Sequence, residues 1–313
     1  MSDRPVSSQA THATQWMRRP ERSNLATLRL MSWISLRLGR PAGRLLLWPI
    51  TVYFVLFAPL ARRASEAYLR RALDRRPGIG DVVRHFHCFA STILDRIYLL
   101  ADRFDLFEIE IEGEAAMRRL IASGEGALLF GAHLGSFEAT RAVGRRLPGL
   151  SIALTMFEDN ARKIKQTLDA INPAARPHII PLGQLDTMLQ VRDALDQGRL
   201  VGLLADRSLE ADETREIRLL DGTARIPVGA FRMAAMLRRR VVFMAGLHFG
   251  GNRYRIRFVE IADFRGLARG NRAAAIDQAM QDYAAELDRC CRLAPYNWFN
   301  FFDFWTAPDE LTE

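Results

Sequence analysis

The sequence predicts an α/β fold in which helices flank a mixed central β-sheet, with an apolar, membrane-associated helix near the N-terminus. From residue 105 onward, short apolar or alternating runs take turns with segments of helical periodicity, and such alternation is typical of an α/β domain. Two turn signals, at 221–222 and 250–252, mark hairpins within this region. A chain of 313 residues is long enough for one large domain of this class.

The region before the sheet divides into two parts. Residues 1–41 are basic and polar, and we expect them to be largely disordered. Residues 42–104 are predicted to be helical and begin with the uncharged apolar run 45–61, which has arginines on both sides. A bilayer span usually needs about 20 apolar residues and an asymmetric basic flank, so an interfacial helix fits better than a clean span. A buried core helix is the alternative. Residues 105–313 then form the α/β domain.

Within that domain, each expected element follows from its pattern of apolar residues. Strands are expected over the apolar or alternating runs 107–112, 126–132, 151–157, 178–182, 199–205, 241–249 and 253–261, with a further hairpin over 216–226. Helices are expected where apolar residues recur at helical spacing, from Ser136 past Arg145 and over 160–171, 185–196, 228–237 and 272–292.

The chain is strongly basic, with a net charge of +8 and a pI near 10. Such a surface indicates an anionic partner, for which nucleic acid, an anionic membrane and an acidic carrier protein are the candidates, unless the arginines only reflect a biased genome. The chain has no nucleic-acid recognition motif and its arginines are spread out, so no nucleic-acid partner is expected. The three cysteines form no metal-binding spacing, which predicts reduced thiols in a cytoplasmic protein without a bound metal.

The chemistry is expected in the segment 131–138, which joins the strand at 126–132 to the following helix. His133 follows the strand, Gly135 permits a tight turn, and Ser136 can cap the helix. Glu138 then lies in the first helical turn, where the helix dipole favours a negative charge. We expect the Glu138 carboxylate to hold one nitrogen of the His133 ring while the other nitrogen faces the substrate.

No serine or cysteine is clearly placed as a nucleophile beside this pair. The substrate is therefore expected to supply a hydroxyl or amine, which His133 deprotonates for direct attack on an acyl thioester. Other interpretations of the motif are a buried structural histidine with a surface glutamate, a hydrolase that activates water with the same pair, and a non-catalytic membrane-associated protein.

The His133-x4-Glu138 motif after the run GALLFGA resembles the motif of the lysophospholipid acyltransferase superfamily. The chain from about residue 42 to 305 resembles more closely the late acyltransferases of lipid A biosynthesis, which are inner-membrane enzymes. The resemblance includes the apolar N-terminal segment, the apolar strand that precedes Asp206, the segment 225–230, and the tryptophan segment around Trp298.

This resemblance implies an acyl carrier protein or CoA thioester as donor, a lipid or glycolipid acceptor, and a position on the cytoplasmic face of the inner membrane, with no cofactor beyond the donor. The residues expected to bind substrate are Gly135, Asn160, Arg162, Asp206, Arg207 and Arg225. The tail departs from the family, because aromatic residues and Asp303 follow Trp298 where the lipid A enzymes carry a His-Arg-Arg run. That change argues against the bis-phosphorylated lipid A precursor as the acceptor.

Overall fold

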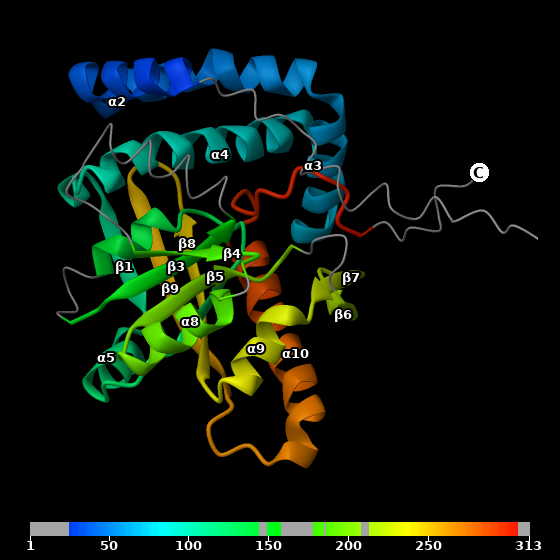
Figure 1. Ribbon diagram of the computed structural model, residues 1–313. Helices are drawn as coiled ribbons and strands as arrows, with labels where there is room; N and C mark the ends of the chain where they lie inside the picture. Colours follow the sequence, from blue (N-terminus) through cyan, green and yellow to red (C-terminus); the bar gives the residue numbers. More distant parts are fainter. Residues whose placement is uncertain (1–24, 144–148, 158–177, 185, 208–212, 306–313) are drawn as a thin grey trace, which may run out of the picture.

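Three N-terminal helices lie along one side of a sheet domain in the computed structural model, which describes residues 25–143, 149–157, 178–184, 186–207 and 213–305 (Figure 1). The helices are α2 (Leu25–Phe57), which is kinked at Gly39, α3 (Pro59–Ala72) and α4 (Ile79–Leu100). The chain breaks at Ala58 because Pro59 cannot continue the helical hydrogen bonding of α2 but suits the first turn of α3. The apolar helix therefore ends at Phe57, slightly before the expected end, and it begins at Leu25, within the segment 1–41 that was expected to be largely disordered.

The predicted mixed sheet flanked by helices is confirmed. Its seven strands lie in the order β1-β9-β8-β2-β5-β3-β4, and only the β8–β9 pair is antiparallel. The strands are β1 (Glu108–Glu112), β2 (Leu128–Gly131), β3 (Ile152–Phe157), β4 (His178–Leu182), β5 (Leu200–Leu204), β8 (Arg240–His248) and β9 (Arg253–Asp263). The hairpin β6 (Thr214–Leu219) and β7 (Gly222–Pro227) forms a separate two-stranded sheet. These bounds agree closely with the runs expected from the sequence.

Helices cover both faces of the sheet, and the central strand β2 is therefore buried on both sides. Leu128 and Phe130 pack into one core cluster with α8, α9 and α10, whereas Leu129 packs into the other with α5. The helices are α5 (Glu114–Ala122), α8 (Thr187–Asp196), α9 (Gly229–Met236) and α10 (Arg272–Leu293), with short 3-10 turns η1 (Phe104–Leu106), η2 (Glu138–Ala142) and η3 (Arg269–Asn271). Helix α5 was not expected from the sequence. The expected helix over 160–171 lies outside the described residues.

Helix α2 is held to the domain by one buried face. Leu47, Thr51 and Val55 recur every four residues and are all buried, which places them on the side that packs against α4. Arg40 adds a bidentate ion pair with the fully buried Asp95, at 2.7 and 2.8 Å. No single described helix has the length and apolarity to cross a bilayer, but Gly39–Phe57 and Pro59–Ala72, bent by 96°, meet that test together.

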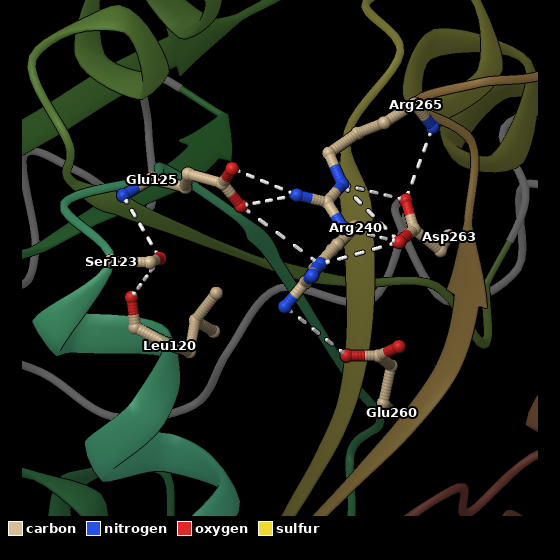
Figure 2. A network of polar contacts seen from close by, with 7 residues as sticks. All are labelled: Leu120, Ser123, Glu125, Arg240, Glu260, Asp263 and Arg265. Carbon is tan, nitrogen blue, oxygen red and sulfur yellow. Dashed lines mark hydrogen bonds and ion pairs between the residues drawn. The ribbon is translucent and has the colours of Figure 1, made fainter.

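An ion-pair network ties the sheet together at the end where β2 begins (Figure 2). Arg265 bridges Glu125 and Asp263 at 2.6 and 2.7 Å, and Arg240 lies 3.3 Å from the same Asp263 carboxylate. These residues come from the segment before β2, the start of β8, the end of β9 and the turn just after it. Because the network lies at the start of β2 and His133 follows its end, these contacts stabilise the sheet rather than the predicted site.

Candidate active site

Strand pairing brings His133 and Asp206 together from positions 73 residues apart. Strands β2 and β5 run parallel with Gly131 opposite Leu204, and His133 and Asp206 each lie two residues beyond these partners. The His133 Nδ1 lies 2.8 Å from the Asp206 Oδ1, and the His133 backbone N–H donates to Oδ2 at 3.0 Å. One carboxylate therefore fixes both the ring and the backbone of the histidine, at the strand ends where α/β folds commonly bind ligands.

The C-terminal tail, residues 296–305, completes the environment of Asp206. The indole Nε1–H of Trp298 and the amide Nδ2–H of Asn300 each donate to the Asp206 Oδ2 at 3.1 Å. The segment between β2 and η2, residues 132–137, is called the histidine loop. The tail also pairs with this loop through its backbone, since the Phe299 N–H donates to the His133 carbonyl at 2.8 Å. The tail up to Asn300 thus folds onto the domain core, with Trp298 only 1% exposed.

This environment keeps Asp206 ionised and His133 neutral. Burial alone would raise the pKa of Asp206, but its contacts with His133 and the nearby Arg207 hold that pKa below its ordinary value. Burial lowers the pKa of His133 below its ordinary value, although the Asp206 anion opposes part of the shift. An ionised carboxylate only accepts hydrogen bonds, so the Nδ1 of neutral His133 carries the proton. Its Nε2 lone pair remains for a base, on a side chain that is 30% exposed.

Glu138 lies elsewhere than predicted. Its carboxylate forms an ion pair with Arg96 of α4, with Oε1 2.7 Å from Nε, and its Oε2 accepts a hydrogen bond from Ser136 at 3.3 Å. The expected contact with His133 is absent from the contacts of the described residues, because the register of β2 and β5 gives Asp206 the Nδ1 side of the ring. Glu138 therefore ties the histidine loop to α4.

The turn after His133 has the glycine and the serine cap that the sequence predicts, but the described residues form the short 3-10 turn η2 where a helix from Ser136 past Arg145 was expected. The backbone N–H of Ala139 donates to the Ser136 Oγ at 3.3 Å, so Ser136 caps the turn η2, which begins at Glu138. Gly135 has a φ of +66°, and a Cβ built there would lie 2.0 Å from the carbonyl oxygen of Gly246 on β8. Both the backbone angle and the close approach thus require glycine.

Replacing Gly135 with alanine should therefore destabilise the protein strongly. We expect Gly135→Ala to lower the free energy of unfolding by more than about 3 kcal/mol, because β8 must move in addition to the strained backbone. Gly124→Ala is the matched control, since Gly124 has a φ of +68° but no atom near its added Cβ. It should cost only about 1 kcal/mol. Equal losses for both variants in denaturant unfolding would contradict the role given to the Gly246 contact.

The other expected binding residues fall into three groups. Arg207 lies beside the pair, where its Nε–H donates to Asn300 Oδ1 at 2.7 Å and its guanidinium lies 5.5 Å from the Phe302 ring centre. Arg225 lies on the separate hairpin and pairs across it with Glu216 at 3.4 Å, so no described contact connects it with His133. Asn160 and Arg162 lie outside the described residues.

Two residues of the site were missed from the sequence. Nothing in the spacing around Asn300 indicates a contact with Asp206, 94 positions away, and Arg96 is one of many arginines on predicted helices. Among the described residues, no group of three or more His, Cys, Asp or Glu side chains has the arrangement to hold a metal ion.

Fold and geometry together define a class of enzyme. A neutral histidine, oriented by a buried carboxylate at the ends of adjacent parallel strands, is an arrangement that can activate a hydroxyl, an amine or water. The model of the bacterial lipid A biosynthesis acyltransferase family matches residues 96–306, about two thirds of the chain, from within α4 to just beyond the tail. The chain belongs to this family and is an acyltransferase, which implies an acyl donor and a lipid acceptor. No curated protein matches the chain.

Proposed function

We propose that the protein transfers a fatty acyl group from a thioester to a hydroxyl or amine of a lipid acceptor by direct attack. His133 Nε2 takes the proton of the acceptor as its oxygen or nitrogen bonds to the thioester carbonyl carbon. The C–S bond then breaks, and the imidazolium returns the proton to the leaving thiolate. The observation that carries this proposal is the 2.8 Å contact of His133 Nδ1 with the buried Asp206, which stabilises the imidazolium.

The cysteines support an acceptor that supplies its own nucleophile. All three are free and buried, and burial raises the pKa of Cys88 and Cys290 to about 12. At neutral pH these two side chains are therefore protonated thiols rather than the thiolates that attack carbonyl carbons. Ser136 is 2% exposed and caps η2. The donor in this proposal is the thioester of an acyl carrier protein or of CoA. The positive net charge of the chain would attract this donor.

The acceptor is proposed to be less anionic than the bis-phosphorylated lipid A precursor. The tail that departs from the family lies beside the catalytic pair, with Phe302 under the Arg207 guanidinium and Asp303 exposed. Arg207 itself is held by Asn300 and by the carbonyl of Phe299 at 3.2 Å. The described residues after Trp298, 299–305, include no basic side chain that could pair with several phosphate charges.

We therefore expect purified protein, given an acyl carrier protein donor, to leave the bis-phosphorylated lipid A precursor unmodified while it acylates a less charged lipid. Mass spectrometry of the two acceptors, each tested alone, measures this preference. Efficient acylation of the lipid A precursor, or rescue of a strain that lacks its own late acyltransferase, would contradict this choice of acceptor.

The protein is further proposed to bind the cytoplasmic face of the inner membrane through the outer side of α2. Around the rest of its circumference, α2 together with the start of α3 exposes large apolar side chains, which are Leu45, Leu46, Trp48, Val52, Tyr53, Phe54, Leu56, Phe57 and Leu60. Beyond this surface, α3 also carries the basic residues Arg63 and Arg70. Exposed apolar side chains with basic neighbours are the composition that anionic bilayers bind.

We expect the wild-type protein to remain with membranes after a high-salt wash, because apolar burial is not screened by salt. A variant carrying Leu45→Ser, Val52→Ser and Leu56→Ser should be released, since each buried side chain of this size contributes about 2 kcal/mol. The matched control carries Leu189→Ser and Met236→Ser, which change similarly exposed apolar residues on α8 and α9, away from α2 (Figure 1). Retention of the α2 variant, or release of the control, would contradict the proposed membrane surface.

The proposed reaction is tested in cells by mass spectrometry of total lipids. Cells that lack the protein should lose a lipid carrying one more acyl chain than a lipid that accumulates in its place. Wild-type protein should restore it, whereas His133→Ala protein at the same abundance should not. An identical lipid profile with and without the protein would overturn the proposal.

A further inference from the structure

Asn300 makes two side-chain contacts that require opposite hydrogen-bonding roles. Its Nδ2–H donates to the Asp206 Oδ2 at 3.1 Å, and its Oδ1 accepts from the Arg207 Nε–H at 2.7 Å. The side chain is buried, with 2% of the residue exposed. Of the short side chains, only an amide or a protonated carboxyl group can donate to an anion with one end and accept from a guanidinium with the other. These two contacts therefore fix the orientation of the amide.

The backbone around Asn300 is held from two sides. Residues Leu134 and Trp298 form an antiparallel bridge between the histidine loop and the tail. From the opposite side, His85 of α4 lies with its Nε2 2.9 Å from the Trp298 carbonyl and its Nδ1 2.8 Å from the Ser65 hydroxyl. A carbonyl only accepts, so Nε2 carries the proton and Ser65 donates to Nδ1. The amide of Asn300 thus comes from a rigid segment.

We propose that Asn300 is a positioning residue for the acyl transfer, which holds the Asp206 carboxylate against His133 and couples it to Arg207. This inference rests on the proposed function of the pair. Asp206 must remain both ionised and immobile to keep the proton of His133 on Nδ1 and leave Nε2 as the base. Without Asn300, the Asp206 Oδ2 would lose one donor, and the partly buried Arg207 Nε–H would lose the Asn300 Oδ1 as its acceptor.

Asn300→Asp tests this role because its effect depends on pH. When the introduced carboxyl group is protonated it reproduces both contacts of the amide, whereas its ionised form loses the donor and places a second anion beside Asp206. We expect kcat to fall by about tenfold or more at pH 8 with little change in KM. The ratio of variant to wild-type kcat should therefore depend on pH: it first falls as the pH is lowered, because the added anion raises the pKa of His133, and it returns toward 1 once the introduced carboxylate takes up a proton.

Two further variants separate positioning from a general loss of structure. Asn297→Asp introduces the same change in the same buried segment, but the Asn297 side chain contacts the backbone of His248, at 2.7 and 3.0 Å, rather than Asp206. Its kcat ratio to wild type should not change with pH at temperatures where it is folded. Asn300→Ala should lower kcat by a factor that is also independent of pH. A pH-independent ratio for Asn300→Asp, or wild-type kcat for Asn300→Ala, would overturn the proposal.

A second measurement needs no substrate and so separates this inference from the proposed function. The His133 ring can be followed by ¹⁵N NMR of the full chain with labelled histidines, and assigned by the signal lost in His133→Ala. An added anion next to Asp206 favours the imidazolium, so the pKa of His133 should be higher in Asn300→Asp than in wild type and unchanged in Asn297→Asp. An unchanged pKa in Asn300→Asp would contradict the coupling even if acyl transfer is observed. If the wild-type protein transfers no acyl group but the pKa of His133 still rises in Asn300→Asp, only the proposed function is contradicted.

Discussion

His133→Ala should reduce acyl transfer by at least about 10²-fold, the lower size of effects seen when a general base is removed. The reason is that the neutral ring offers its Nε2 lone pair from a partly exposed position, while Asp206 holds the Nδ1 side. We expect kcat and kcat/KM to fall together, because the base acts in the transition state rather than in substrate binding. Steady-state kinetics with a defined acyl thioester measures the loss.

The control for this variant is His178→Ala. His178 begins β4 and is exposed, so its loss removes an imidazole without disturbing the pair. The control should keep near-normal turnover. Near-normal turnover by a folded His133→Ala protein would contradict the assignment of His133 as the base.

Asp206→Asn should have the second largest effect, a loss of about 10²- to 10⁴-fold in kcat. The substitution keeps the shape of the side chain but removes the anion that stabilises the imidazolium and selects the Nδ1–H form of the ring. The pH dependence of kcat/KM should change as well, and the direction of that change follows from the charge of Asp206. Wild-type kcat/KM should rise with pH through the pKa of His133, which lies below its ordinary value of 6.5. The Asp206 anion raises that pKa, so the acid limb should move to lower pH in Asp206→Asn.

Glu138→Gln is the matched comparison for Asp206→Asn, because each substitution removes one of the two carboxylate charges considered as the partner of His133. Glu138 pairs with the partly exposed Arg96, and ion pairs of this kind contribute little. Its loss should lower kcat by less than about tenfold and leave the acid limb unchanged. A larger loss for Glu138→Gln than for Asp206→Asn would restore Glu138 as the partner of His133.

Most of the fold was predictable because it depends on local patterns. The Asp221–Gly222 turn and the Gly250–Gly251–Asn252 turn marked both hairpins, and the alternation from residue 105 gave every described strand of the sheet. Helix α5 was missed because it is only nine residues long, which is too short for the helical repeat of apolar residues to stand out between two strands.

The site was predictable only where it is local in the sequence. The histidine, the turn at Gly135 and the cap at Ser136 follow from one short segment. The partner of His133 does not, because it depends on β5 lying next to β2, and strand order cannot be obtained from one sequence. Asp206 was therefore expected among the substrate-binding residues, and Glu138 was preferred for its nearness along the chain. To predict the contact of Asn300 with Asp206, one would also have to know that the tail runs back across the histidine loop.

Product analysis in a single turnover tests the central claim most directly. Purified protein is mixed with a stoichiometric acyl thioester and lipids extracted from cells that lack the protein, and all acyl-containing products are followed by mass spectrometry. Direct transfer by the His133–Asp206 pair predicts one acylated lipid for each thiol released, no acyl-protein, and no product with His133→Ala. Free fatty acid as the sole product would show a hydrolase, and a trapped acyl-protein would contradict direct attack by the acceptor.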